Sequence, residues 1–204
     1  MDYCYVLFVR AGDEDKVCRM LTNRLGLEQF IPFVPKKIMV FKRNGKFSKV
    51  PRVCFPGYVF IKSDYPPAQF LAKMFPCVYP LKEVYRFLHY GNDRSDVALH
   101  ENERIQLYRL FGDKFIIDCV IGVMSGDRIQ IISGPFVGIE GTVKKVIPRK
   151  REVVVEIPIF GGNNQTTLGL DIVEKVKNDY SGDELSDGFI YSTKSEMKVG
   201  GYRQ

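Results

Sequence analysis

The sequence predicts a two-domain α+β protein, with an N-terminal α/β domain of sandwich type followed by a small five-stranded β-barrel. Two observations predict this. The first half mixes helical and strand patterns, whereas the region from residue 127 is rich in Val and Ile, is interrupted by Gly and lacks helical periodicity. The chain has 204 residues, of which 45% are hydrophobic, so it can build two small cores.

The first domain is expected at residues 1–112. Residues 3–10 alternate aliphatic and aromatic side chains, as a strand does, and Asp13 is a plausible N-cap for the helix that follows. Apolar spacing and Gly or Pro breaks place the other elements. Strands are expected at 30–34, 36–42, 46–52, 57–62 and within 77–88, and helices at 14–26, 66–74 and 101–111.

Asn44-Gly45 is the strongest hairpin signal in the chain, because both residues tolerate the positive φ angles of a two-residue turn. The strands on either side of it are strongly cationic. A sheet with helices to one side is the economical packing for this first domain.

The second half divides into a linker, a barrel and a tail. Gly112-Asp113 ends the preceding helix and Gly122 interrupts the linker at 113–125, but its apolar run 115–121 is expected to pack in part on a domain. Residues 177–204 are polar, and we expect a flexible tail there. The barrel is expected at 126–176, with strands at 128–132, 139–147, 152–158, 165–168 and 172–174.

Positive charge is concentrated in two places. Residues 1–112 hold 18 Lys and Arg against 11 Asp and Glu, whereas residues 113–176 hold 8 of each. Within the balanced region, five cations crowd positions 144–151. Lys144 and Lys145 are successive strand residues, so their side chains are expected on opposite faces. A polyanionic partner is the natural expectation for such basic segments.

Other classes of protein find little support. The five cysteines are scattered and form no C-x-x-C, which favours reduced thiols packed as small hydrophobic residues over a disulfide framework or zinc site. The two histidines stand in no catalytic or metal-binding motif, and there is no phosphate-binding loop. We therefore expect no enzyme activity, no cofactor and no metal. No apolar run could cross a bilayer and no signal peptide begins the chain, so a cytoplasmic, membrane-free monomer is expected.

Three motifs, in this order and spacing, resemble the NusG family of transcription elongation factors. They are Phe55-Pro56-Gly57-Tyr58-Val59, then Gly134-Pro135-Phe136 with Gly141-Thr142-Val143, and then Ile159-Phe160-Gly161. The second motif looks like a KOW module, a small Gly-punctuated barrel. The resemblance spans residues 3–176. It implies that the first domain docks on RNA polymerase through an apolar patch, with the matching residues Phe55, Tyr58, Tyr79 and Leu81.

Two further segments, Phe33-Val34-Pro35-Lys36 and Glu156–Gly161, resemble the LoaP subgroup of specialised NusG paralogues. This subgroup comprises operon-targeted antiterminators that bind an RNA hairpin in the nascent leader. The resemblance therefore implies a structured leader RNA as partner, and non-template DNA as a further one. The RNA-binding residues expected on this basis are Lys144, Lys145, Arg149, Lys150, Arg151, Lys42 and Arg43.

Four alternatives remain at this point, one of which is an enzyme whose activity the sequence does not announce. A general NusG-type factor would use Ile159-Phe160 to bind a termination helicase or a ribosomal protein. A ribosome-associated KOW protein would not contact polymerase. A solvated, charged hairpin tip would account for the basic turn without any RNA. Phosphate contacts alone choose no sequence, so selective binding would need base contacts, for which Arg149 and Arg151 are the best candidates.

Overall fold

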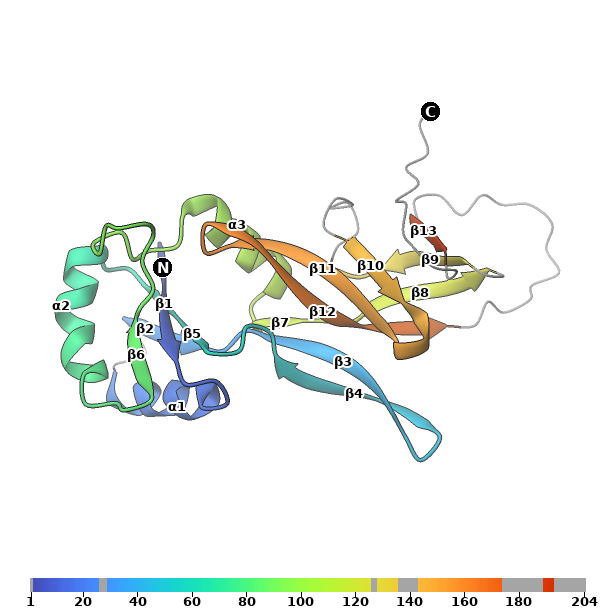
Figure 1. Cartoon of the computed structure of the whole chain (residues 1–204). Coiled ribbons are helices and arrows are strands. Elements are labelled where there is room, and N and C mark those ends of the chain that lie inside the picture. Colours follow the sequence, from blue (N-terminus) through green and yellow to red (C-terminus); the bar gives the residue numbers. More distant parts are fainter. Residues whose placement is uncertain (1, 26–28, 126–127, 136–142, 174–188, 193–204) are drawn as a thin grey trace. The chain divides into compact units, whose positions relative to one another are not determined.

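The computed structural model describes residues 2–25, 29–125, 128–135, 143–173 and 189–192, in two compact units (Figure 1). Neither unit is continuous in sequence. The hairpin at 37–52, expected in the first domain, belongs to the second unit, and the short turn at 158–163 belongs to the first. The first unit comprises Met1–Lys36, Val53–Ile116 and Pro158–Asn163; the second comprises Lys37–Arg52, Ile117–Ile157 and Asn164–Gln204.

An antiparallel four-stranded sheet forms the centre of the first unit. Its strand order is β2-β5-β1-β6, and Leu7 of β1 pairs with Val59 of β5 on one side and with Phe87 of β6 on the other. The strands match the expected positions, although β6 is shorter than predicted. Their bounds are Tyr3–Val9 for β1, Phe30–Phe33 for β2, Tyr58–Ser63 for β5 and Val84–Phe87 for β6.

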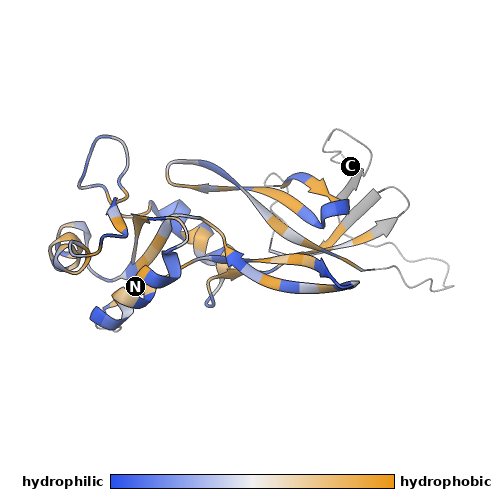
Figure 2. Ribbon diagram, turned by 60° about the horizontal axis from the view of Figure 1, so that its bottom comes forward, coloured by the Kyte–Doolittle hydropathy of each residue, from blue (hydrophilic) through white to orange (hydrophobic). Residues whose placement is uncertain are grey.

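Helices cover both faces of this sheet, so the expectation of helices on one side alone is wrong, because Phe60 and its neighbours give the second face an apolar surface of its own. Helices α1 (Glu14–Arg24) and α2 (Pro67–Val78) pack on one face, where Leu7, Val59 and other alternate strand residues join a common core with Leu21 and Met74. Helix α3 (Glu101–Phe111) lies on the other face, since its Phe111 ring packs against Phe55, which in turn packs on Phe60, the β5 residue that alternates with Val59. Figure 2 shows both hydrophilic and hydrophobic residues on α1 and α2, as expected for amphipathic helices. The sandwich-type architecture predicted for this region is present.

Helix α2 is longer than predicted. The expected helix stopped at residue 74, and residues from 77 were expected to be extended, but the helix continues through Pro76 to Val78. Proline is compatible with a helix when the lost backbone bond and the bend are tolerated. Here the extra turn buries Val78 in the same core as Phe70 and Met74, and that packing outweighs the local preference.

Six strands of the second unit form one sheet of order β10-β11-β12-β8-β9-β13. The predicted five-stranded barrel is not confirmed. Two predicted strands, 165–168 and 172–174, belong to one long strand, and a further strand lies in the predicted tail. The bounds are Val120–Ser125 for β8, Arg128–Ser133 for β9, Val143–Ile147 for β10, Glu152–Ile159 for β11, Gly162–Val173 for β12 and Phe189–Ser192 for β13.

Residues that alternate along the strands define the core of this unit. Along β11 the residues alternate between half-buried and buried, and Val153, Val155 and Ile157 are at most 1% exposed. The remaining residues of the predicted tail and residues 136–142 of the Gly-rich motif lie outside the described residues. The predicted linker, residues 113–125, contains β7 (Ile116–Ile117) near its beginning and β8 at its end.

The cationic hairpin consists of β3 (Lys36–Arg43) and β4 (Lys46–Val53), joined at Asn44-Gly45 as predicted, in a sheet of order β4-β3-β7. A glycine allows it to approach β12 closely. A Cβ on Gly169 would lie 2.8 Å from both the Ile38 carbonyl oxygen and the Val40 nitrogen. Only glycine leaves room for backbone to pack on backbone in this way.

Candidate functional site

The turn before β5 positions the predicted aromatic patch. Gly57 adopts φ +86°, which favours glycine, and its N–H donates a 2.6 Å hydrogen bond to Glu14 Oε1. Glu14 is only 3% exposed and also accepts a hydrogen bond from the N–H of Gly12 at 3.0 Å. A buried carboxylate therefore ties the start of α1 to the Phe55–Tyr58 turn. Sequence reasoning missed Glu14, because an acid in the first turn of a helix usually marks only the helix end.

The two leading patch residues differ in exposure. Phe55 is 6% exposed and packs among Phe60, Phe111 and Phe160. Tyr58 is half-buried; its ring stacks on Phe160 with centroids 4.8 Å apart and makes a tilted contact with Phe8, with centroids 5.5 Å apart. Phe160 belongs to the 158–163 turn of the same unit, and the neighbouring Gly161 N–H donates to Glu103 Oε1 at 2.7 Å. In this conformation Phe160 covers part of the patch.

The other two predicted residues lie elsewhere. Tyr79 follows the end of α2, is 79% exposed and packs against Phe75 with ring centroids 5.6 Å apart. Leu81 is 3% exposed and belongs to the core between the sheet and helices α1 and α2. Of the four residues, Tyr58 and Tyr79 offer surface to a partner, and Phe55 and Leu81 support the fold beneath.

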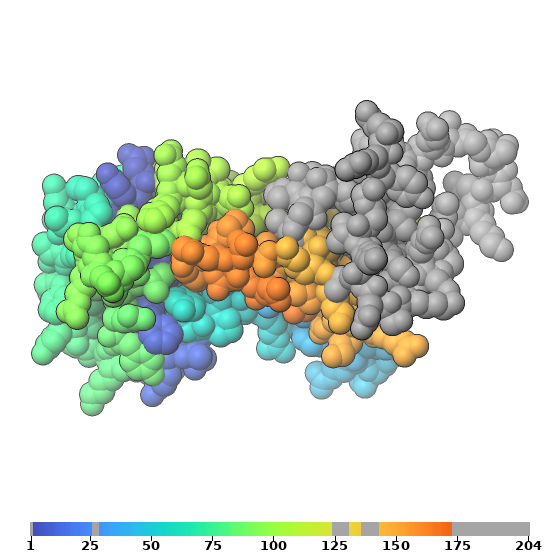
Figure 3. Space-filling view, turned by 45° about the horizontal axis from the view of Figure 1, so that its top comes forward, coloured from blue at the N-terminus to red at the C-terminus, as the bar shows by residue number. Residues whose placement is uncertain are grey.

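A basic surface lies on the second unit, where two segments distant in sequence meet. The 3-10 turn η2 (Pro148–Lys150) and its cap Arg151 follow β10, and the Arg151 guanidinium lies 3.6 Å from the centre of the Phe47 ring of the hairpin. Asp171 of β12 pairs with Lys49 at 2.8 Å and with Arg151 at 3.6 Å. We call Phe47, Lys49, Arg151 and Asp171 the clasp. In Figure 3 the light-blue atoms of the hairpin and the amber atoms of the turn lie side by side.

Electrostatics strengthens the clasp. The hydrogen bond to the Asp171 carboxylate is the main cause that raises the pKa of Lys49 above its usual range, with a further contribution from Cys119. Burial raises the pKa of the Cys119 thiol, which keeps it protonated and unreactive. Arg151 is held at φ 54°, and its side chain is 20% exposed. These contacts make Arg151 part of the framework of the basic surface.

The remaining predicted RNA-binding cations are accessible. Arg149 and Lys150 are exposed on η2, and Lys42 and Arg43 are exposed at the end of β3. Lys144 pairs with Glu156 at 2.7 Å. The expected strict alternation of Lys144 and Lys145 is wrong, because the β10–β11 ladder shifts register between Val143 and Lys145 and both lysines are exposed.

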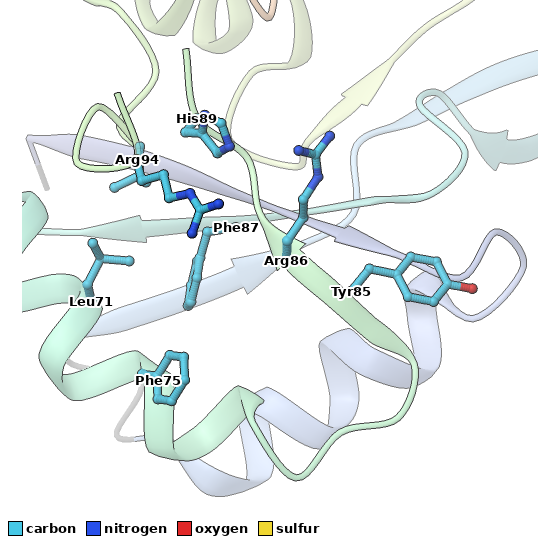
Figure 4. Close-up of a pocket in the computed structure, with 8 residues that line it drawn as sticks. Leu71, Phe75, Tyr85, Arg86, Phe87, His89 and Arg94 are labelled. Carbon is cyan, nitrogen blue, oxygen red and sulfur yellow. The ribbon is translucent and has the colours of Figure 1, made fainter. Parts of the chain in front are cut away.

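A shallow cavity of about 450 Å³ opens on the first unit between α2, β6 and the segment that follows (Figure 4). The Arg94 and Phe87 side chains approach one another there, and Tyr85 points away. Within the described part of the chain, His89 Nδ1 is buried without a hydrogen-bond partner. No sequence motif marked this cavity. Its lining consists of Leu71, Phe75, Tyr85, Arg86, Phe87, His89, Arg94 and Val97.

The described residues contain no group of three or more His, Cys, Asp or Glu side chains placed to hold a metal ion. Nor does any helix among them combine the length and apolar character needed to span a membrane. Cys4, Cys54 and Cys119 are buried, which confirms the prediction that these cysteines pack as small side chains. Burial raises the pKa of Cys4 to about 12.

Comparison with known proteins places this arrangement in a family. The chain is 27% identical over 180 residues to the transcription termination/antitermination protein NusG of Thermus thermophilus, covering 85% of this chain and 97% of that protein. It is 26% identical over 186 residues to the NusG protein of Pseudomonas aeruginosa, covering 84% and 97%. With the Synechocystis NusG protein the identity is 29% over 183 residues, covering 84% and 88%.

Two family profiles match in chain order. A KOW motif matches residues 125–157, in the region of β8–β11. The profile described as transcription termination factor nusG matches residues 2–107, which is more than half of the chain and includes the aromatic patch and the cationic hairpin. The chain therefore belongs to the NusG family.

Proposed function

We propose that this protein is an operon-targeted transcription antitermination factor of the LoaP type. It binds RNA polymerase through the aromatic patch of the first unit and a leader RNA hairpin through the basic surface of the second. Polymerase-bound protein tethered to the RNA then acts at a high effective concentration on one operon and favours processive elongation. We propose further that the KOW strands close into a small barrel. Non-template DNA near the polymerase is an additional proposed partner.

The single observation that carries this proposal is the meeting of two basic segments in one unit. Phe47 and Lys49 from the hairpin and Arg151 from the KOW turn are joined through direct contacts with one another or with Asp171. The exposed cations of both segments consequently lie on one supported surface. Several phosphates can be neutralised together by such a surface, and the guanidinium of Arg149 is free to reach a base edge.

The polymerase half of the proposal is supported by the family membership and by the surface of Tyr58 and Tyr79. Aromatic rings suit docking on a helical partner, because they bury a large apolar area and lose little rotamer entropy. Phe160 packs on Tyr58, so polymerase and the 158–163 turn compete for the same ring.

The proposal is tested by measuring binding of the full chain to the leader RNA of the neighbouring operon and to a shuffled RNA, at near-physiological salt. Preference for the leader RNA is the expected result. It should be accompanied by recovery of the protein with polymerase, and both should be measured with the Arg149→Ala variant alongside. Equal binding to both RNAs, with polymerase binding intact, would favour a general factor.

A general NusG-type factor is the second candidate, with Ile159-Phe160 binding a termination helicase or ribosomal protein. Ile159 is fully buried, and Phe160 is engaged with Phe55, Tyr58 and Phe60. That partner would need the 158–163 turn to be released first. A pull-down with the Phe160→Ala variant distinguishes the two candidates, since only the general factor loses its second partner.

A further inference from the structure

The cationic hairpin has two distinct faces. Its turn residues Asn44 and Gly45 have φ angles of 50° and 78°, as in a two-residue turn that sets Arg43 opposite Lys46. Side chains alternate between faces from there. Lys42 and Phe47 share the inner face, which carries the clasp to Arg151. Phe41 falls on the outer face with Arg43 and Lys46.

The outer face presents an aromatic ring surrounded by positive charge. Phe41 is 40% exposed, and the Arg52 guanidinium lies 5.5 Å from its ring centre. A single exposed apolar residue would need no explanation. The charge around Phe41 does need an explanation, because residues 29–63 contain eight Lys and Arg and no Asp or Glu. An acidic or neutral apolar partner would meet only one of these features, whereas a nucleic acid meets both.

Unpaired bases are the groups that use an aromatic ring and cations together. A base stacks on the ring face, while Lys and Arg hold the phosphates on either side of it. Base pairs inside an A-form stem cannot stack on a protein side chain, because both of their faces are covered by neighbouring pairs. The occupant of the outer face must therefore come from a loop, a bulge or a single-stranded flank.

We propose that Phe41 is a stacking platform for an unpaired base of the bound RNA, with Arg43, Lys46 and Arg52 holding the adjoining phosphates. This inference rests on the proposed RNA-binding function. It adds which part of the RNA is recognised by the cationic hairpin of the protein. The turn η2 and the exposed Lys42 contact the stem, and the outer face takes a nucleotide beyond it. The leader RNA is thereby selected by an unpaired element as well as by its stem.

The test compares Phe41→Leu with Phe41→Tyr in the full chain. Leucine keeps apolar volume but removes the ring face, and tyrosine retains it. Phe75→Leu is the control, since Phe75 is 55% exposed but belongs to the first unit. The probes are the leader stem-loop with a fluorescent adenine analogue at an unpaired position, a blunt RNA duplex of the same stem, and a single-stranded DNA of the loop sequence.

Phe41→Leu is expected to weaken stem-loop binding about tenfold and to abolish quenching of the unpaired analogue. Binding of the blunt duplex should be unchanged, and Phe41→Tyr and Phe75→Leu should behave like the parent protein. Equal stem-loop affinity and quenching in Phe41→Leu would overturn the platform while leaving RNA binding intact. Equal loss on stem-loop and duplex would also overturn it. Phe41-dependent binding that favours the DNA strand would overturn the assignment to RNA.

Failure of the underlying function gives a different result. In that case the parent protein itself binds the leader stem-loop no better than a shuffled RNA, which overturns the proposed function together with the platform that rests on it. Melting temperatures of all variants should agree closely, because Phe41 lies on the exposed end of β3. A Phe41→Leu variant that melts well below the parent would make Phe41 a fold residue and overturn the proposal.

Discussion

The aromatic patch of the first unit and the basic surface of the second are built in opposite ways. In the patch, Phe55 is 6% exposed and Tyr58 is half-buried, so the residues expected to bind also hold the sheet, α3 and the 158–163 turn together. On the basic surface, Arg149 and Lys150 are exposed and lie outside the core. Substitutions in the patch should alter stability and binding together, whereas those on the basic surface can alter binding alone.

The clasp is the exception that makes this comparison useful. Arg151 belongs to the basic turn, but it stacks on Phe47 and pairs with Asp171. Arg151 therefore contributes to the stability of the fold, as the residues of the aromatic patch do. Stability and RNA affinity measured on the same variants separate the residues that bind from those that position.

The largest expected effect lies beneath the patch. Replacing Glu14 with Ala removes the acceptor for the Gly57 N–H and the Gly12 N–H. Hydrogen bonds to a charged, buried group are strong, so urea unfolding should show a loss of about 2–4 kcal/mol in the first unit. Glu101→Ala is the matched control, because that side chain is 78% exposed and should cost little. Similar losses for both variants would mean that Glu14 does not anchor the turn.

Tyr58→Ala should weaken polymerase binding by about 1–3 kcal/mol, as loss of an aromatic hot spot does. It should also cost about 1 kcal/mol of unfolding free energy, since the ring stacks on Phe160 and makes a tilted contact with Phe8. Tyr79→Ala sharpens the comparison, because Tyr79 is 79% exposed and its loss should leave melting unchanged. Unchanged polymerase affinity in both variants, measured by titration with purified polymerase, would remove the patch from the site.

Local sequence patterns were sufficient for most of the first unit and for the cationic hairpin of the second. The spacing of Val17 and Leu21, the apolar strands and the Asn44-Gly45 turn each encode their structure within a few residues. Local patterns failed where contacts between residues distant in sequence determine the structure. The extra turn of α2 past Pro76 depends on Val78 reaching a core built from four other elements. No window of sequence around residue 76 contains that information.

The same limit explains what was missed at the candidate site. Arg149 and Lys150 were identifiable, because charge at a turn is visible in sequence. Phe47 and Asp171 were not, because their roles arise from a contact across more than a hundred positions with Arg151 and Lys49. The register shift after Val143 was equally hidden, and it exposes both lysines that alternation would have separated.

Arg149→Ala probes a residue that should bind without holding the fold. If its guanidinium reads a base, the loss should be about 1–3 kcal/mol for the leader hairpin and much smaller for a scrambled RNA. Its melting temperature should match the parent, because the side chain is exposed. A gel-shift titration with both RNAs measures this. Equal weakening on both would make Arg149 a phosphate contact only.

Arg151→Ala should behave differently, costing about 1 kcal/mol of stability through the lost ring contact and ion pair. RNA affinity should fall, but the slope of affinity against salt should stay near that of the parent, since Arg151 positions the surface and does not meet a phosphate. Phe47→Ala should reproduce the effect, and the double variant should add little to it. An additive double variant, or a flatter salt slope for Arg151→Ala, would return Arg151 to direct contact with RNA.

The smallest effect distinguishes two neighbouring lysines. Lys144 is paired with Glu156 at 2.7 Å, whereas Lys145 is exposed on the same strand. A phosphate contact by Lys145 would release about one counterion, so Lys145→Ala should flatten the slope of log affinity against log salt by about 1 and weaken leader and scrambled RNA alike. Lys144→Ala should change the slope less, because its charge is already balanced by a carboxylate. Titrations at several salt concentrations compare the two slopes. A larger change for Lys144 would mean that RNA displaces Glu156, and the basic surface would then extend along β10 beyond the turn.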